Sequence, residues 1–218
     1  MDAVIYSCSA SCTCPHKASK ICGWILSGWI ERSSKMANVF VFLADGLEEV
    51  EALTPIDLLR RAGDDVTTVS IMDKKTIIGG HNVKIKADKK FAKVDFSEGD
   101  LFILPGGGVG TENIEAHDAL KSLLVEKYEA GKHIAAICAA PRYLGELGFL
   151  QGKKAVVYPG LEDRLIGADV QQVPAVTDGN ITTGHGPGAA TDFAFELIRV
   201  LHGEETVAKI KEEFVYPY

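Results

Sequence analysis

The chain has 218 residues, of which 46% are hydrophobic and 24% charged, and this is enough apolar sequence for one globular domain of ordinary size. Its net charge of −7 and the lack of a Lys/Arg-rich block argue against a nucleic-acid binder and against a protein that docks on an anionic membrane. No apolar run reaches the roughly 18 residues that predict a membrane-spanning helix.

The cysteines are distributed unevenly. Cys8, Cys12, Cys14 and Cys22 lie in the first 35 residues, and Cys138 is the single cysteine of the remainder. One cysteine has no partner for an internal disulfide, so we expect the remainder to be a reduced, cytoplasmic domain.

Residues 1–35 differ from the rest in being rich in Ser and Cys and in carrying four Lys or Arg against two Asp or Glu. We interpret them as a disordered leader, or as sequence upstream of a true start at Met36, because a convincing strand begins about three residues after Met36. A targeting segment and a metal site of these cysteines with His16 are alternatives, although the spacing fits no two-pair zinc pattern. The domain is therefore placed at residues 36–218.

In chain order, the domain alternates strand and helix patterns. The continuous apolar run at 38–44 predicts a strand buried on both faces. Residues 51–63 predict a helix with Thr54 as its cap and Pro55 at its first position. The later strand patterns lie at 65–71, 75–88 (a hairpin), 101–110 (a strand that runs into a glycine loop), 133–137, 154–159 and 180–184. The later helix patterns lie at 113–131, after Cys138, at 189–203 and at 204–214.

This alternation predicts an α/β protein with a mostly parallel, doubly wound sheet and helices on both faces. In such sheets, ligands bind beyond the carboxyl ends of the strands. That rule selects three loops, at 45–51, 105–112 and 138–140, as the place to look for a site.

A single thiol stands where the strand at 133–137 turns into a helix. A nucleophile elbow needs small residues two positions before and after the nucleophile, and Ala136 and Ala140 satisfy this around Cys138. The following helix supplies unpaired N–H groups and a partial positive charge, so we expect the pKa of the thiol to be lowered. The competing interpretation is a buried, inert cysteine that packs as a small hydrophobic residue.

Three carboxylates, Glu48, Glu49 and Glu51, follow the first strand. For Glu48 and Glu49, a favourable interaction with the helix dipole is the better explanation. If the loop faces Cys138, a carboxyl group beside a thiolate in a partly dry pocket should hold its proton. Glu51 would then hydrogen-bond to the thiolate and move a proton during the reaction.

The glycine loop LPGGGVG (104–110) matches no nucleotide-binding motif. Thr111 stands where a dinucleotide fingerprint needs glycine, and no Lys-Ser/Thr pair follows as in a Walker loop. The loop is either a plain turn or an oxyanion site, in which backbone N–H groups approach a reacting oxygen with no Cβ in the way. In the second case the N–H groups of Gly107 and Ala139 would be the donors.

The histidines give no clear general base. A cysteine hydrolase usually has a histidine within reach of the thiol. His202 and Glu204 resemble the His-x-acid pair of glutaminases, but the end of a helix favours a capping role for His202. His185 follows a short strand and is interpreted as a substrate-side or structural residue. The remaining histidines, which we interpret as surface or packing residues, are His81, His117 and His133.

Four motifs in this order resemble the ThiJ/PfpI family: ADGLEEVEALTPIDLLRRAG (44–63), LPGGGVG (104–110), AAICAAP (135–141) and GHGPGAATDFA (184–194). Within that family, which belongs to the class I glutamine-amidotransferase-like superfamily, they are similar to the deglycase/glyoxalase III branch of the Parkinson-disease protein. The resemblance extends over residues 37–214. It implies a flavodoxin-like three-layer α/β/α sandwich, no metal and no organic cofactor.

The resemblance also implies partners and site residues. It implies a homodimer, with Glu48 and Arg61 in an anion site at the dimer face and His81 at the position of the second arginine. The substrate would be a small aldehyde or a glycated amine or thiol. The implied site has Cys138 as nucleophile, a protonated Glu51, oxyanion donors at Gly107 and Ala139, and Gly106, Tyr158 and His185 on the substrate side.

Three positions depart from the family pattern. Peptidase members carry a histidine directly after the nucleophile, so Ala139 disfavours a peptidase. Tyr158 stands where some members have a histidine and others an aromatic residue. His185 replaces an arginine that is common in one relative.

We therefore expect a cofactor-independent cysteine enzyme that acts on α-oxoaldehydes such as methylglyoxal, as a glyoxalase III (lyase) or a deglycase (hydrolase). The alternative is a redox-sensing, stress-protective protein or holdase that uses oxidation of Cys138 to sulfenic or sulfinic acid. A cysteine peptidase or amidase is a weaker alternative.

Overall fold

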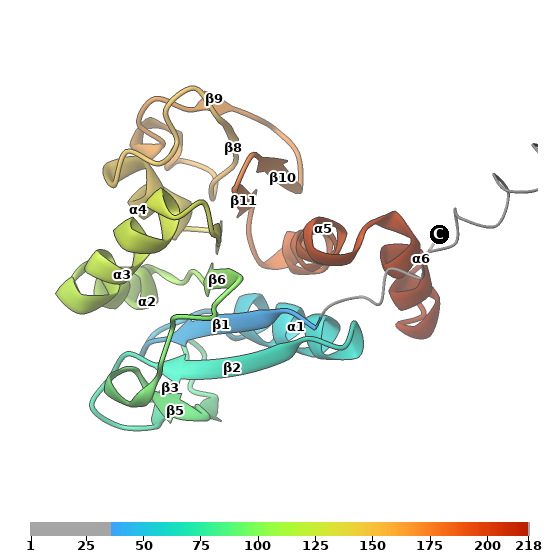
Figure 1. The fold of residues 1–218 in the computed structure, drawn as a ribbon. Helices are drawn as coiled ribbons and strands as arrows, with labels where there is room; N and C mark the ends of the chain where they lie inside the picture. Colours follow the sequence, from blue (N-terminus) through green and yellow to red (C-terminus); the bar gives the residue numbers. More distant parts are fainter. Residues whose placement is uncertain (1–35, 218) are drawn as a thin grey trace, which may run out of the picture. The chain divides into compact units, whose positions relative to one another are not determined.

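The computed structural model describes residues 36–217, and the predictions for residues 1–35 lie outside that range. Strands and helices alternate along the chain (Figure 1). The strands are β1 (Asn38–Leu43), β2 (Asp65–Ser70), β3 (Thr76–Ile78), β4 (Lys84–Lys86), β5 (Lys89–Lys90), β6 (Leu101–Leu104), β7 (His133–Ile137), β8 (Lys154–Ala155), β9 (Asp169–Val170), β10 (Ala175–Asp178) and β11 (Ile181–Gly184). The helices are α1 (Glu49–Arg61), α2 (Gly108–Glu115), α3 (Asp118–Glu129), α4 (Pro141–Glu146), α5 (Ala190–His202) and α6 (Glu204–Glu213), with 3₁₀ turns at Phe91–Lys93, Glu162–Arg164 and Pro187–Ala189.

A seven-stranded sheet in the order β10-β11-β7-β6-β1-β2-β5 forms the centre of the domain. Its neighbouring strands pair in parallel, except for the antiparallel pair β10 and β11. The predicted mostly parallel, doubly wound sheet is confirmed, and so is the hairpin, which β3 and β4 form.

The sheet is covered on both faces because its central strands β1, β6 and β7 are buried along almost their whole length. Along β1, Val39, Val41 and Leu43 pack in one cluster with α1, α5 and α6. Phe40 and Phe42 point the other way, into a second cluster with α2, α3 and α4. In Figure 1, α2, α3 and α4 accordingly lie on the opposite side of the sheet from α5 and α6. The result is the expected three-layer α/β/α sandwich.

The first helix begins earlier than the sequence predicts. Its cap is Glu48, whose Oε2 accepts a hydrogen bond from the N–H of Glu51 at 3.0 Å. Thr54 and Pro55, expected at the start, lie inside the helix instead. The prediction was wrong for two reasons. A glutamate caps the helix, although Ser, Thr, Asp and Asn are the usual caps. The helix also accommodates Pro55, which has no backbone N–H to donate.

The predicted helix at 113–131 is two helices. The chain turns at Ala116 and His117, and this turn separates α2 from α3. Nδ1 of His117 accepts a hydrogen bond from the N–H of Leu120 at 3.0 Å. His117 is thus a helix cap rather than a surface or packing residue. The strand expected at 154–159 is shorter than predicted, because β8 pairs only with the two-residue β9.

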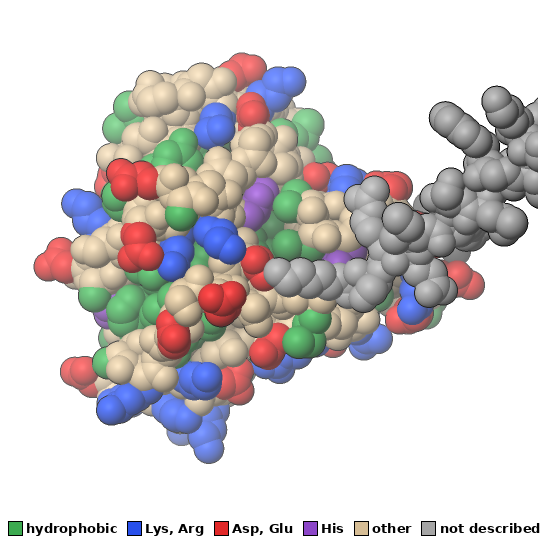
Figure 2. Space-filling view, in the orientation of Figure 1, with side chains coloured by type: hydrophobic (Ala, Val, Ile, Leu, Met, Phe, Trp, Pro, Cys, Tyr) green, Lys and Arg blue, Asp and Glu red, His purple; other side chains and the backbone are tan. Residues whose placement is uncertain are grey.

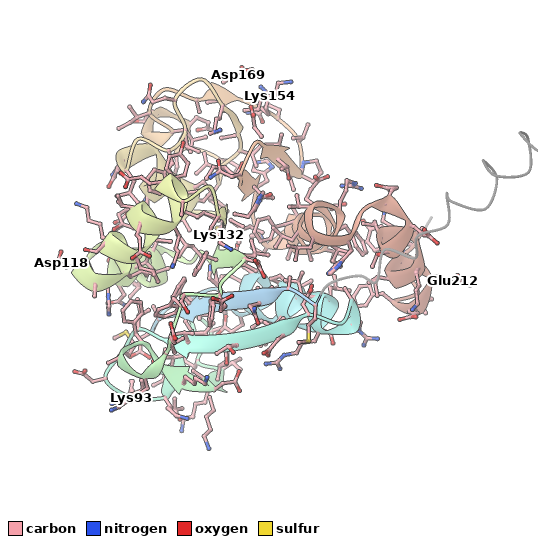
Figure 3. The ribbon with its side chains drawn as sticks, in the orientation of Figure 1. Lys93, Asp118, Lys132, Lys154, Asp169 and Glu212 are labelled. Carbon is pink, nitrogen blue, oxygen red and sulfur yellow. The ribbon has the colours of Figure 1, made fainter. Side chains whose placement is uncertain are left out.

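Charged side chains of both signs are mixed over most of the face seen in Figure 2, and several Lys or Arg side chains gather at its lower end. Exposed side chains such as Lys93, Asp118 and Glu212 project outward from the ribbon (Figure 3). Within residues 36–217, none of the helices has both the length and the apolar character needed to cross a membrane.

A buried acid–imidazole pair lies where α5 ends. Nε2 of His202 is 2.8 Å from Oδ1 of Asp64, and this oxygen also accepts a hydrogen bond from the N–H of Ala37. Both side chains are almost fully buried. His202 therefore joins the end of α5 to the loop before β2, and the expected interaction with the helix end is replaced by this pair.

Candidate active site

The chain turns sharply at Cys138, as an elbow requires. β7 is buried along its whole length. The next residue, Cys138, has a φ of +64, a left-handed backbone conformation that residues other than glycine rarely adopt. The N–H of Cys138 donates to the carbonyl of Gly184, and its own carbonyl accepts from the N–H of Tyr158. Backbone contacts on both sides thus hold the strained residue in place.

This strain gives a testable consequence for stability. A protein with glycine inside a helix or strand is normally less stable than the same protein with alanine there, by about 0.5–1 kcal/mol. At a φ of +64, however, alanine carries the steric cost of its Cβ and glycine does not. We predict that Cys138→Gly is more stable than Cys138→Ala by about 1 kcal/mol in urea unfolding. Ala140, at φ −66, is the control, since Ala140→Gly should show the ordinary order. A Cys138→Ala protein that is more stable than Cys138→Gly would contradict the strain.

Glu51, in the first turns of α1, reaches the same place from the other side of the glycine loop. Its side chain is fully buried, and Oε2 accepts a hydrogen bond from the N–H of Gly106 at 3.0 Å. Oε1 has no hydrogen-bond partner of normal geometry among the described residues. A buried carboxylate oxygen without a donor is costly, so this oxygen is suited to carry a proton or to receive one from a substrate.

Gly106 lies directly between the two side chains. A Cβ at this residue would be 2.6 Å from Oε2 of Glu51 and 2.7 Å from Cβ of Cys138. Only glycine therefore lets the acid and the thiol approach each other here. The structure brings together the loops after β1, β6 and β7 that the sheet rule selected.

Burial raises the pKa of Glu51 to about 7. Interaction with the Cys138 thiol lowers the pKa, the charge of Glu48 raises it, and the N–H of Gly106 lowers it. Around neutral pH, Glu51 is therefore close to half-protonated, which suits a group that both gives and takes a proton.

The raised pKa of Glu51 predicts a pH-dependent stability. A carboxyl group with a pKa of about 7 in the folded chain and 4.5 as its model value binds more protons when folded. Its contribution to the free energy of unfolding is therefore full below pH 4.5 and is lost as the pH rises through 7, by roughly 3 kcal/mol in total. We predict that the parent loses this stability relative to Glu51→Gln between pH 4 and 8, measured by urea unfolding.

The comparison with Glu51→Gln removes other titrations from this result. Burial lowers the pKa of His133 to about 4, so His133 adds stability as the pH rises through 6.5, opposite to Glu51. That trend is common to both proteins and cancels in their difference. A difference that stays constant with pH would contradict the raised pKa of Glu51.

The thiol does not have the lowered pKa that the sequence predicts. Burial is the largest effect, and together with the charge of Glu51 and its hydrogen bond it raises the pKa of Cys138 to about 12. The N–H groups of Gly107 and Ala139 lower the pKa, as expected at a helix start, but they are outweighed. The acid and the thiol together therefore lose a first proton near pH 7 and hold one proton between them from about pH 7 to about pH 12.

The predicted oxyanion donors face the sulfur. The N–H groups of Gly107 and Ala139 are the two backbone groups that act on the thiol. Gly107 has φ +89, and a Cβ there would lie 2.5 Å from the carbonyl oxygen of Gly46 and 2.7 Å from the nitrogen of Glu48. Glycine at this position therefore lets the loop after β6 pack on the loop after β1, which aims its N–H at the elbow.

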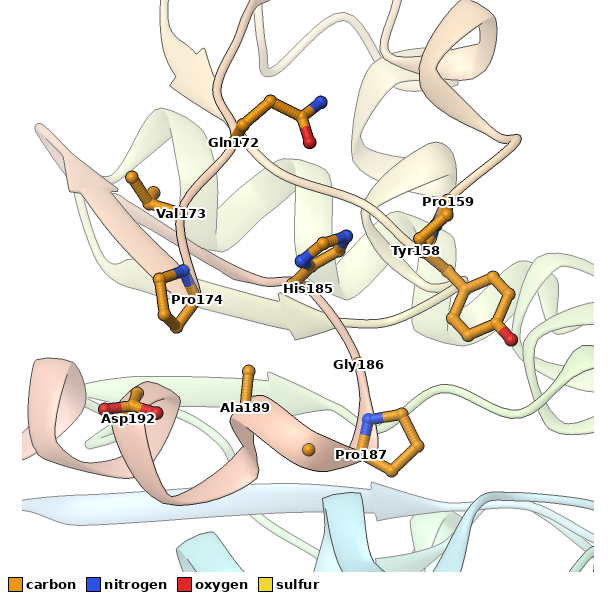
Figure 4. A pocket seen from close by; sticks show the side chains of 11 residues that line it. Tyr158, Pro159, Gln172, Val173, Pro174, His185, Gly186, Pro187, Ala189 and Asp192 are labelled. Atoms are coloured by element: carbon orange, nitrogen blue, oxygen red, sulfur yellow. The ribbon is translucent and has the colours of Figure 1, made fainter.

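A pocket of about 410 Å³ lies beside the two segments that bond to the backbone of Cys138, at Tyr158 and at Gly184 (Figure 4). His185 and Tyr158, both predicted on the substrate side, line it, and the ring of His185 lies between Tyr158 and the segment that carries Val173. Sequence reasoning missed the contribution of residues 172–174 and of Asp192. Residues 172–174 lie in an irregular segment without a motif, and Asp192 was read only as part of α5.

The predicted anion-site residues do not meet within one chain. Glu48 caps the start of α1, and Arg61 is its last residue, about 20 Å away along a 13-residue helix. Arg61 pairs instead with Asp57, Nε to Oδ2 at 2.9 Å. An anion site that uses both residues stays a prediction that requires a second chain.

Glu49 has a structural role that the dipole interpretation missed. Its carboxylate is buried and accepts hydrogen bonds from the N–H and from Nδ1 of His81, each at 2.8 Å. Donor atoms of Glu48, Glu49 and His81 lie within 4.8 Å of one another, which is compatible with a metal ion. The pairing of His81 with Glu49 already explains this arrangement, and it fixes the hairpin loop beside α1.

The fold and site define a class of α/β protein with a cysteine on a strained strand-to-helix elbow and a buried acid beside it. The model of the DJ-1/PfpI family matches residues 37–200, and the chain belongs to this family. Protein dj-1beta of Drosophila melanogaster is 33% identical over 183 residues, 83% of this chain and 98% of the relative. The deglycase PH1704 of Pyrococcus horikoshii is 33% identical over 166 residues, 75% of this chain and 99% of the relative.

A solved structure gives the same result. Oxidized DJ-1 of Toxoplasma gondii superimposes with a TM-score of 0.80 at 37% identity, covering 84% of this chain and all of that one. The flavodoxin-like sandwich expected from the resemblance is therefore confirmed.

Proposed function

We propose that this protein is a cofactor-independent cysteine enzyme that converts α-oxoaldehydes to hydroxy acids, with Cys138 as the nucleophile. The observation that carries the proposal is the buried Glu51, with a pKa of about 7, across Gly106 from the elbow thiol. Kinship with a deglycase supports a reaction on aldehyde adducts. The elbow thiol, the buried acid and the backbone donors lie close together, which supports a single site with a nucleophile, a proton-transfer group and oxyanion donors.

In the first step, Sγ of Cys138 attacks the aldehyde carbon. The proton shared by the thiol and Glu51 moves to the carboxyl group as the S–C bond forms. The carboxyl group then passes this proton to the former aldehyde oxygen, which gives a hemithioacetal and leaves Glu51 as a carboxylate. The N–H groups of Gly107 and Ala139 stabilise negative charge on the former aldehyde oxygen. The buried surroundings strengthen these hydrogen bonds.

In the second step, Glu51 moves a proton from the first carbon to the second through an enediol, which turns the hemithioacetal into a thioester. A carboxyl group with a pKa near the working pH can remove this proton and return it. Water then cleaves the thioester, which frees the thiol and releases the hydroxy acid. The net reaction for methylglyoxal is addition of one water to give lactate.

Lactate release from methylglyoxal, measured with no added thiol cofactor, tests the proposal. We expect saturable lactate formation by the parent protein. Absence of lactate above the buffer blank, with a folded protein, would overturn the proposal. A preformed adduct of methylglyoxal with N-acetyl-lysine separates the two reaction types. A deglycase removes the adduct faster than the adduct dissociates spontaneously, and a glyoxalase removes it no faster.

The redox alternative rests on the same thiol. Kinship with a protein solved as oxidized DJ-1 favours it, and the donors at Gly107 and Ala139 would also bind the oxygens of a sulfinate. Mass spectrometry of the Cys138 peptide after mild peroxide treatment tests this role. A sulfinate on Cys138 together with negligible lactate formation would favour the sensor over the enzyme. A homodimer and a cytoplasmic location stay predictions.

A further inference from the structure

The pocket beside the elbow is much larger than methylglyoxal needs. Its volume is about 410 Å³, whereas a cavity of roughly 150 Å³ already holds a benzene molecule. Pockets of roughly 300–1,000 Å³ are typical of sites for small organic ligands. A substrate whose side group is one methyl would leave most of this space filled by water.

Two residues that line the pocket lie next to the backbone of the elbow. The carbonyl of Cys138 accepts from the N–H of Tyr158, and the N–H of Cys138 donates to Gly184, which His185 follows. Tyr158 and His185 therefore flank the elbow on its two sides and both line the pocket.

Most of the pocket wall is apolar, and its polar side chains are Gln172, His185 and Asp192. Tyr158 and Val173 are large hydrophobic side chains with 48% and 39% of their surface exposed, and both line the pocket, on opposite sides of His185 (Figure 4). Pro174 and Pro187 add two rigid apolar rings. Aromatic groups stack on tyrosine, histidine and proline rings, and their burial there removes apolar surface from water.

The charge at the pocket selects against acids. Asp192 contributes a carboxylate to the lining, and Oδ1 of Asp192 accepts a hydrogen bond from the hydroxyl of Tyr216 at 3.3 Å. Among the lining residues there is no lysine or arginine to balance this charge. A neutral side group is therefore favoured over a carboxylate.

We propose that this pocket binds the side group of the substrate and makes the enzyme selective for α-oxoaldehydes that carry a neutral aromatic group, of which phenylglyoxal is the simplest. The inference rests on the proposed function, because it takes the Cys138 thiol as the attacking group. Phenylglyoxal would be converted to mandelate by the same addition of one water.

The first experiment compares kcat/KM for phenylglyoxal and methylglyoxal. We expect a ratio of at least about 10 in favour of phenylglyoxal in the parent. The two aldehydes also differ in intrinsic reactivity, and a matched pair of variants separates this difference from the effect of the pocket. Val173 lies in the pocket and Val200 lies on α5 outside it, and both side chains are 39% exposed. Val173→Ser should lower the ratio several-fold, and Val200→Ser should leave it unchanged. Tyr158→Ala should lower the ratio further.

The second experiment measures binding without chemistry. Acetophenone, which has the aromatic group but no aldehyde, is titrated into Cys138→Ser protein and followed by saturation-transfer NMR. We expect saturable binding that weakens when Val173→Ser is added and does not change when Val200→Ser is added.

The outcomes separate the two proposals. Turnover of both aldehydes, with the same ratio in both valine variants and no saturable acetophenone binding, would overturn the aromatic site and leave the proposed function standing. No turnover of either aldehyde, with acetophenone binding that depends on Val173, would overturn the proposed function and still support an aromatic site.

Discussion

Replacing Cys138 by serine is expected to lower kcat/KM for methylglyoxal by about four orders of magnitude. A serine hydroxyl is a far weaker nucleophile than a thiol, and no histidine is positioned to activate it among the groups that act on residue 138. Removal of a nucleophile that acts in concert with its base typically costs roughly 10³–10⁶ in rate. Lactate release under saturating and subsaturating methylglyoxal measures the loss.

The serine variant also serves as its own folding control. Serine differs from cysteine by one atom and meets the same φ of +64, so its unfolding free energy should stay within about 1 kcal/mol of the parent. Glu51→Gln should lose roughly 10²–10⁴ in kcat/KM, because the amide cannot move a proton. A Cys138→Ser protein that consumes methylglyoxal at the parent rate would contradict the proposed function.

Adding one methyl group at Gly106 is expected to lower kcat/KM by about two orders of magnitude. The Cβ of Gly106→Ala would lie 2.6 Å from Oε2 of Glu51, 2.7 Å from Cβ of Cys138 and 2.7 Å from the carbonyl oxygen of Ile137. These are closer than van der Waals contact, so the acid and the thiol must move apart. A shift of about 1 Å in a reacting geometry can cost 10²-fold in rate.

The same loop offers a matched control. Gly108 is the first residue of α2, and a Cβ there would meet no atom within 4 Å. Gly108→Ala should therefore keep the parent kcat/KM within a factor of about two. Steady-state kinetics of the two variants side by side measure the difference. Equal activities for Gly106→Ala and Gly108→Ala would contradict the approach of Glu51 and Cys138 across Gly106.

The sequence predicts the fold well where a run of apolar residues determines the burial of an element. The apolar run of β1 is buried on both faces as expected, because a central parallel strand excludes water on either side. The start of α1 was mispredicted because Glu48 caps it, and the side chain of glutamate is not a frequent cap. The break at His117 was missed because one histidine makes a cap by a contact that periodicity does not reveal.

For the site, the elbow residue and the glycine loop are predictable from local sequence. The approach of Glu51 to Cys138 follows from the rule that ligands bind at the carboxyl ends of parallel strands. The direction of the thiol pKa was mispredicted. Local sequence reveals the helix start, which lowers the pKa, but not the depth of burial, which raises it more. The pocket wall at Val173 comes from an irregular segment, whose position only the tertiary structure determines.

The central claim is that Glu51 and Cys138 act as one pair that loses its first proton near pH 7. The most direct test is the rate at which iodoacetamide alkylates Cys138 between pH 5 and 10, followed on the Cys138 peptide by mass spectrometry so that the other four cysteines do not interfere. We predict that the parent rate rises with a midpoint near pH 7, and that Glu51→Gln shifts the midpoint to higher pH, above the roughly 8.5 of free cysteine. A parent midpoint near 8.5 that Glu51→Gln leaves unchanged would contradict the account.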